Sequence, residues 1–165
     1  MSAFVALPGH VTLQRAGPDS APLIASLVNA HSLNLVGTRR ALIDDDGDLR
    51  LARYMPGSAE VYIGYIGRAA PSVLFYLVAR PPHVVVELGC TLLPGFNRAA
   101  PAALAWLEGR ARELAAAAPE DARMVMQCLV LSADATLAAA LAERGFAGVR
   151  RWVHFELELT APPPV

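Results

Sequence analysis

The sequence contains no lysine, and all 14 of its basic residues are arginine. A P-loop lysine, a lysine Schiff base and a lysine nucleophile are therefore excluded. Cysteine is scarce as well: Cys90 and Cys128 are the only two, and both fall in runs that we predict to be buried strands. Two cysteines cannot form a disulfide framework, so we expect reduced core thiols in a cytoplasmic protein.

Several other features are also missing. The formal net charge is −1, which gives no reason to expect nucleic acid or a membrane surface as a partner. The N-terminus lacks the basic flank and long apolar stretch of a signal peptide. Because Arg68, Pro71 and Arg80 interrupt the longest apolar stretches, no transmembrane helix is expected. The four histidines show no ligand spacing, so we predict no metal site.

Apolar residues are abundant. They make up 55% of the 165 residues, and alanine accounts for much of this fraction. A chain of this length is expected to form one domain over residues 1–165, with an ordered core at about 10–160 and short loose termini. A partly apolar surface can dock a second copy, so a homodimer is one assembly that we consider.

Hydrophobic periodicity predicts the element order β-α-α-β-β-β-α-β-α-β. Turn signals at Gly67 and at residues 81–82 separate three successive strands, as in an antiparallel meander. In the longest helix, Glu108 and Arg112 form an i,i+4 pair on the expected solvent side. The predicted fold is an α/β domain with a mixed, mostly antiparallel central sheet flanked by about four helices. The predicted strands lie at 11–15, 59–66, 72–79, 83–92, 124–131 and 151–159. A first helix is predicted after Asp19 or Ser20, with its apolar face at residues 23–28. Further helices are predicted at about 38–54, where a turn at 44–48 divides the stretch, at 100–118, and between Asp134 and Gly145.

The last third of the chain has a distinctive spacing. The apolar run at 124–131 predicts a strand covered on both faces. Asp134 or Ser132 can cap the helix that follows, since either side chain can accept from free N–H groups. Gly145 stands where a helix ends in a left-handed residue, and an alternating strand begins at Arg151.

With this order the chain resembles the GCN5-related N-acetyltransferase (GNAT) superfamily over nearly its full length. The resemblance is carried by residues 87–94 (ELGCTLLP), which look like the strand that seats the acetyl group, by residues 106–113 (WLEGRARE) and by the closing 145–146 pair. The first-helix region and the tryptophan-containing helix are most similar to domains of tandem-GNAT bacterial enzymes. The resemblance implies an acetyl-CoA-dependent or other acyl-CoA-dependent N-acyltransferase.

In that family the turn after the acetyl-seating strand presents backbone N–H groups to the pyrophosphate of coenzyme A, helped by a helix dipole. The family loop reads Arg or Gln, two variable residues, Gly, one residue, then Gly or Ala. Aligned without a gap, Asn97 takes the Arg/Gln place, and Ala100 and Ala102 take the two glycine places. A gapped alignment on Trp106 makes the loop about two residues short. We expect the loop to accept coenzyme A with Arg98 as its nearby cation, the alternative being a helix N-terminus that binds nothing.

The resemblance also implies roles in catalysis. Glu87 would be the base that takes a proton from the amine, unless it is only a solvent-facing strand residue. The tyrosine that serves many relatives as general acid is replaced by Leu141. Asp134 stands where an asparagine often contacts the cofactor, and N–H groups near Leu92 and Leu93 would polarise the thioester carbonyl. The implied cofactor-binding residues are Leu92, Leu93, Asn97, Arg98, Ala99, Ala100, Ala102 and Asp134.

Three functions remain open from the sequence. The first is transfer of an acetyl or short acyl group to a small-molecule or peptide amine. The second is a catalytically degenerate domain that acts as a binding or dimerisation module, which the glycine-free loop and Leu141 favour. The third is a relative that binds a different nucleotide or thiol. We predict no metal cofactor for any of them.

Overall fold

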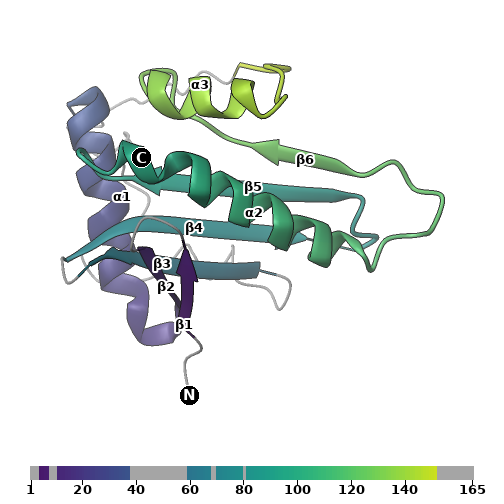
Figure 1. Cartoon of the computed structure of the whole chain (residues 1–165), viewed down its shortest axis with the longest axis horizontal. Coiled ribbons are helices and arrows are strands. Elements are labelled where there is room, and N and C mark those ends of the chain that lie inside the picture. Colours follow the sequence, from purple (N-terminus) through teal and green to yellow (C-terminus); the bar gives the residue numbers. More distant parts are fainter. Residues whose placement is uncertain (1–3, 8–10, 38–58, 68–69, 80, 152–165) are drawn as a thin grey trace, which may run out of the picture.

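The computed structural model describes residues 4–7, 11–37, 59–67, 70–79 and 81–151 of the chain. In this part, six strands form a single sheet on which three α-helices pack (Figure 1). The elements are β1 (Phe4–Leu7), β2 (Val11–Arg15), α1 (Ala21–Val36), β3 (Ala59–Ile66), β4 (Pro71–Ala79), β5 (Val85–Leu92), α2 (Ala100–Ala115), β6 (Val125–Cys128) and α3 (Ala135–Glu143).

The strands lie in the sheet in chain order, β1-β2-β3-β4-β5-β6. Every neighbouring pair is antiparallel except β5 and β6, which are parallel. The parallel pair is joined by the α2 crossover, because a tight turn cannot connect two parallel strands. The predicted meander over β3, β4 and β5 and the mixed α/β fold are confirmed.

The two faces of the sheet have separate cores. Successive residues of a strand point to opposite faces, and on β4 Phe75 joins the core under α2 and α3, whereas Leu74 packs against α1. Leu104 and Leu107 supply the α2 side, and both are at most 1% exposed. The helices therefore form two layers: α2 and α3 on one face, with α2 lying in front of the strands in Figure 1, and α1 on the other.

The start of α3 matches its prediction. The Oδ1 atom of Asp134 accepts a hydrogen bond from the N–H of Leu137 at 3.0 Å, which satisfies one of the free donors at the helix N-terminus. Leu137 and Leu141 are buried on one face of the helix. Gly145, with φ of 84°, follows the helix in the left-handed conformation that glycine enters without steric cost.

Some boundaries differ from the prediction. β1 was not predicted, because a four-residue strand close to the N-terminus carries little periodic signal. β6 covers four residues instead of 124–131, and Val125 and Leu129 are 43% and 59% exposed instead of covered. α2 ends at Ala115 and not at residue 118. The predicted helix at 38–54 and nearly all of the predicted strand at 151–159 lie outside the described residues.

Buried glutamates tie α2 to its neighbours. Glu60 on β3 accepts from Arg110 of α2 at 2.7 and 2.6 Å, and this contact lowers the pKa of the Glu60 carboxyl. Glu108 pairs with Arg144, next to the end of α3, and this hydrogen bond lowers the pKa of Glu108. Glu108 also meets Arg112 at 3.5 Å as predicted, but it is 7% exposed, so the expectation that it faces solvent was wrong.

Candidate functional site

The parallel strands β5 and β6 separate halfway along β5. They are paired from Val85 and Val125 to Leu88 and Cys128. Beyond this point β6 has ended, while β5 continues to Leu92 and pairs with β4 alone among the described strands. This leaves one side of residues 89–92 without a ladder partner in the described sheet. We refer to this gap between the two strands as the opening.

Glu87 lies two residues before the opening. In the ladder it stands between Val78 of β4 and Gln127 of β6, and its half-buried side chain is on the α1 face, opposite to buried Leu88. The hydroxyl of Tyr76 donates to Oε1 of Glu87 at 3.2 Å. The carboxylate is therefore held at the edge of the opening, where the base role predicted for it is sterically reasonable.

Gly89 allows this arrangement. It pairs with Tyr76 across the β4–β5 ladder, and a Cβ atom on Gly89 would lie 1.7 Å from the tyrosine ring. A side chain at this position would displace the ring, because protein interiors leave no room for such overlap. Glycine thus lets Tyr76 lie against β5 with its hydroxyl at Glu87.

Two thiols lie near the opening on the α2 and α3 face of the sheet, opposite to the face of Glu87. Cys90 is 6% exposed and Cys128 is half-buried, and both belong to the core under α2 and α3. Burial raises the pKa of the Cys128 thiol to about 11, with smaller contributions from Glu87 and Asp134. Burial, helped by the charges of Cys128 and Asp134, also raises the pKa of Cys90. Both cysteines are therefore protonated core thiols at neutral pH and unsuited to nucleophilic attack.

This protonation state predicts slow alkylation of the native protein. A pKa of about 11 for Cys128, against an ordinary 9.0, lowers the thiolate fraction roughly 100-fold. We expect iodoacetamide near neutral pH to label Cys128 roughly 100-fold more slowly in the folded protein than in urea, measured by mass spectrometry. Rapid native labelling of either cysteine would contradict this and reopen the case for a nucleophilic thiol.

At the end of β5, one of the two N–H groups predicted to polarise a thioester is already hydrogen-bonded within the protein. Leu92 is 7% exposed and pairs with Val73 in the ladder to β4. The N–H of Leu93 donates to the carbonyl of Ser72 at 3.0 Å. The Leu93 N–H thus already has a partner within the protein, and the roles predicted for Leu92 and Leu93 toward a thioester stay predictions.

The loop that follows β5 also uses several N–H groups internally. The N–H of Phe96 donates to the carbonyl of Leu93 at 3.1 Å, and the N–H of Ala99 donates to that of Phe96 at 2.9 Å. The N–H of Ala100 donates to the carbonyl of Asn97, so a short 3₁₀ turn, Asn97–Ala99, leads directly into α2. These donors are engaged within the turn and are not presented to a ligand in this conformation.

The remaining predicted loop residues lie at the start of α2. Arg98 and Pro101 are exposed, whereas Ala100 is 1% exposed and belongs to the core. Ala102 is half-buried on the first turn. Pro101 has no N–H to offer, so Arg98 is the loop residue that could meet a phosphate by charge. The cofactor-binding roles of Asn97, Arg98, Ala99, Ala100 and Ala102 stay predictions.

Asp134 has a second partner besides its helix. Its Oδ2 atom lies 3.2 Å from Nε2 of His31 on α1, and the two side chains are 12% and 11% exposed. The His31–Asp134 contact thus joins α1 to the start of α3, which pack on opposite faces of the sheet. The predicted contact of Asp134 with a cofactor stays untested.

Neither a protein-family model nor a curated protein matches the sequence. Solved structures do match. A GCN5-related N-acetyltransferase from Sphaerobacter thermophilus superposes with a TM-score of 0.60 and 16% identity over 85% of this chain, which spans 44% of that protein's length. A predicted acetyltransferase from Clostridium acetobutylicum, solved with acetyl-CoA, gives 0.57 and 12% identity, covering 88% of this chain and 96% of that one. An aminoglycoside antibiotic 6′-N-acetyltransferase from Acinetobacter baumannii gives 0.53 and 17% identity, with 90% and 99% covered.

The chain has the GNAT fold. In this GNAT fold β5 is the strand expected to seat an acyl group, residues 93–99 form the loop expected to meet pyrophosphate, and α2 is the helix that follows it. Sequence identities of 10–17% to the solved structures support the same fold, but they do not transfer the role of any residue to this chain. The site must therefore be argued from this chain's own residues.

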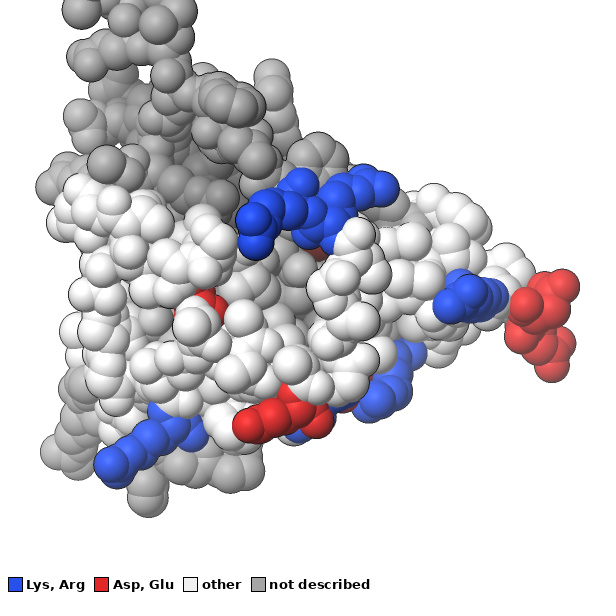
Figure 2. All heavy atoms as spheres, turned by 90° about the horizontal axis from the view of Figure 1, so that it is seen from above, with Lys and Arg blue, Asp and Glu red and all other residues white. Residues whose placement is uncertain are grey.

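The surface and the titratable groups of this GNAT fold give further information. Figure 2 shows the face seen from above: over the described residues its charged side chains stand in small separate groups on a largely uncharged surface. The described residues hold no cluster of three or more His, Cys, Asp or Glu side chains that could ligate a metal ion. Among the described helices, none combines the length and apolar character needed to span a bilayer.

Sequence reasoning missed two residues near the opening, Tyr76 and Gln127, and it considered His31 only as a residue that could line the acceptor site. A signal existed for Tyr76, because the register of the predicted meander places it opposite a glycine, where an aromatic ring can lie flat on the neighbouring strand. Gln127 could have been found as the polar residue in an otherwise apolar strand run. No local signal connects His31 with Asp134, since 103 residues separate them.

Proposed function

We propose that this chain is an acyl-CoA-dependent N-acyltransferase that moves an acetyl or short acyl group to an amine. The observation that carries the proposal is the parting of β5 and β6 directly beyond the carboxylate of Glu87. A thioester donor bound in the opening would bring its carbonyl next to a group that can accept a proton from an amine. The GNAT fold, shared with a neighbour solved with acetyl-CoA, supports this donor.

The chain's own residues would act mainly by positioning. Glu87, fixed by Tyr76, would take one proton from the amine, whose nitrogen then attacks the thioester carbonyl carbon. The carbon–sulfur bond breaks, and the thiolate leaves as coenzyme A after gaining a proton. Leu141, at the place of the usual acid, is 5% exposed in the core and cannot supply this proton, so water would do so.

A second function is favoured by a specific observation. The N–H groups of Leu93, Phe96, Ala99 and Ala100 are all engaged within the protein, and no glycine stands in the first turn of α2. A loop with so few available donors would bind a pyrophosphate weakly, since each charge-assisted hydrogen bond contributes ~1.5–3 kcal/mol. The alternative is therefore a GNAT-fold domain without catalysis that binds or dimerises.

Thermal unfolding with and without acetyl-CoA separates the two functions. If the chain binds the donor, acetyl-CoA at ~100 times its Kd should stabilise the fold by ~2.7 kcal/mol, which raises Tm by several degrees. The variant Arg98→Ala should need roughly tenfold more acetyl-CoA for the same shift. Arg123→Ala, which removes an exposed arginine from the turn before β6, is the matched control and should behave as wild type.

The opposite result is equally clear. If millimolar acetyl-CoA leaves Tm unchanged, the transferase proposal fails and the non-catalytic domain is supported. A shift with another nucleotide or thiol, and none with acetyl-CoA, would identify a different ligand class for the same loop.

A further inference from the structure

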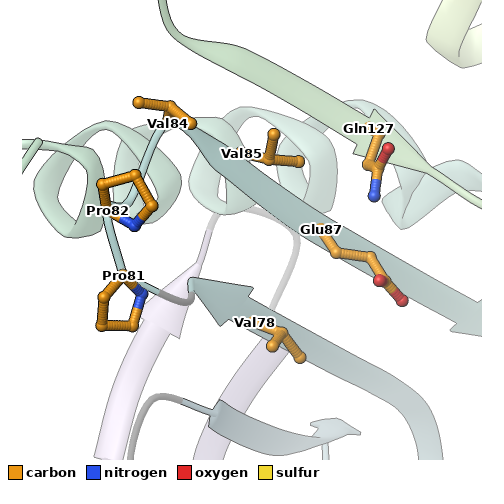
Figure 3. A pocket seen from close by; sticks show the side chains of 7 residues that line it. All are labelled: Val78, Pro81, Pro82, Val84, Val85, Glu87 and Gln127. Carbon is orange, nitrogen blue, oxygen red and sulfur yellow. The ribbon is translucent and has the colours of Figure 1, made fainter. Parts of the chain in front are cut away.

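A cavity of about 200 Å³ lies beside Glu87, on the α1 face of the sheet. It is lined by residues from the end of β4, the turn that follows, the start of β5 and the middle of β6 (Figure 3). The lining residues are Val78, Pro81, Pro82, Val84, Val85, Glu87 and Gln127. This cavity was not predicted from the sequence.

The lining is chemically two-sided. Three valines and two prolines form apolar walls, and Figure 3 shows Glu87 and Gln127 together at the other side, on adjacent strands. These two residues are a registered pair of the β5–β6 ladder, so their side chains leave the sheet on the same face. Within the described part of the chain, Oε1 of Glu87 accepts a hydrogen bond from the Tyr76 hydroxyl, and Oε2 accepts none. A carboxylate oxygen and a side-chain amide are thus available to a ligand that enters between apolar walls.

We propose that this cavity is the acceptor pocket, and that it takes a primary amine carried on a small, branched apolar group. This inference rests on the proposed acyl transfer to an amine, and it adds which class of amine is the acceptor. The cationic ammonium complements the Glu87 carboxylate, and the amide oxygen of Gln127 can accept a second N–H. The apolar group packs on the valines and prolines. The volume of about 200 Å³ is below the ~300–1,000 Å³ of pockets for drug-sized ligands, which limits the group to a few carbons.

The position of the pocket suits transfer. Glu87 and Gln127 are the last but one pair before β5 and β6 part, so the nitrogen would lie about two strand residues, ~6.6 Å, from residue 89, where the opening starts. An amine with a polar or charged tail would have to desolvate that tail against the apolar walls. The pocket therefore selects for charge at one end only.

Binding can be tested without any acyl donor, on the full chain. The probe is 3-methylbutylamine, followed by the NMR signals of ¹³C-labelled valine methyl groups, which include Val78, Val84 and Val85. Two comparison ligands are 3-methylbutan-1-ol, which has the same shape without the charge, and ethane-1,2-diamine, which has charge without the branched group. We expect the monoamine to bind roughly tenfold more tightly than either.

Two substitutions locate the binding site. Glu87→Gln should weaken 3-methylbutylamine roughly tenfold, and Glu120→Gln, which changes an exposed carboxylate outside the pocket, should not. Val85→Phe should fill the cavity and abolish the valine shifts, and Val149→Phe, at a 91% exposed position, should leave them unchanged. The Val85 variant keeps the test valid if the loss of the Glu87 charge disturbs the fold.

The inference and the proposed function fail separately. If acetyl-CoA binds but the alcohol or the diamine binds as well as the monoamine, the substrate class is wrong and the transferase proposal stands. If the monoamine binds at the pocket but acetyl-CoA does not bind, the pocket is confirmed as an amine site and the transfer reaction is lost. Valine shifts that persist in Val85→Phe would overturn the location.

Discussion

Replacing Glu87 by glutamine is expected to lower the turnover of an apolar amine with acetyl-CoA by about 10²–10⁴-fold. A general base contributes an effect of this size, and an amide cannot accept the amine proton. Glutamine has the same shape and can still meet the Tyr76 hydroxyl, which lies 3.2 Å from Oε1. The affinity for acetyl-CoA, measured by calorimetry, should therefore change less than about twofold, because the proposed donor site lies on β5 beyond Glu87.

The controls for Glu87→Gln separate a chemical role from a structural one. Tyr76→Phe removes the hydroxyl that positions the carboxylate, and we expect a smaller loss in kcat, about tenfold, with little change in Tm. Glu120→Gln removes an exposed carboxylate and should leave turnover unchanged. If Glu87→Gln turns over as fast as the wild type, Glu87 is not the base, and the carboxylate serves at most in amine binding.

Local physics made much of the fold predictable. The strands of the meander follow from periods of two residues bounded by turn signals, and the start of α3 follows from the capping side chain of Asp134. The left-handed Gly145 is equally local. The GNAT fold emerged because these elements have the right order, and order is contained in the sequence.

Contacts between distant residues were not predictable in the same way. The Glu108–Arg112 pair was foreseen from i,i+4 spacing, but the contact of Glu108 with Arg144, which buries the carboxylate, depends on how α3 docks on α2. The length of β6 depends on where β5 leaves it, and not on the apolar run alone. A strand pattern reports propensity, whereas the end of a ladder is set by tertiary geometry.

In the candidate site, too, local features were predictable from the sequence and contacts between distant residues were not. Glu87 was found through the resemblance, as a carboxylate on the strand expected to seat the acetyl group, and its ladder partners Val78 and Gln127 were not considered. The loss of glycine at Ala100 was visible, but the sequence did not reveal that the Leu93 N–H already bonds Ser72. Backbone donors carry no residue-specific signal, so their availability can be judged only from the folded chain.

Replacing Arg110 by methionine is expected to lower the free energy of unfolding by ~3–5 kcal/mol, the usual cost of leaving a buried charge without its partner. Glu60 is 7% exposed and receives two hydrogen bonds from Arg110, at 2.7 and 2.6 Å, and one from the Tyr62 hydroxyl at 3.0 Å. Arg15, at 3.7 Å and largely exposed, cannot replace a bidentate partner. For a chain of this size the loss corresponds to roughly 6–20 °C in Tm.

The dependence on pH tests the cause of this loss. Because Arg110 lowers the pKa of Glu60 in the folded protein, the stabilisation is present above the ordinary value of 4.5 and is lost as the pH falls through the lower folded pKa. The difference between wild type and Arg110→Met, measured by urea unfolding, should be largest near neutral pH and shrink below about pH 4.5. Arg112→Met, which removes a 66% exposed arginine lying 3.5 Å from Glu108, is the matched control and should cost at most ~1 kcal/mol. A loss in Arg110→Met that did not change with pH would show that the packing of the arginine stem, and not its charge, connects α2 to the sheet.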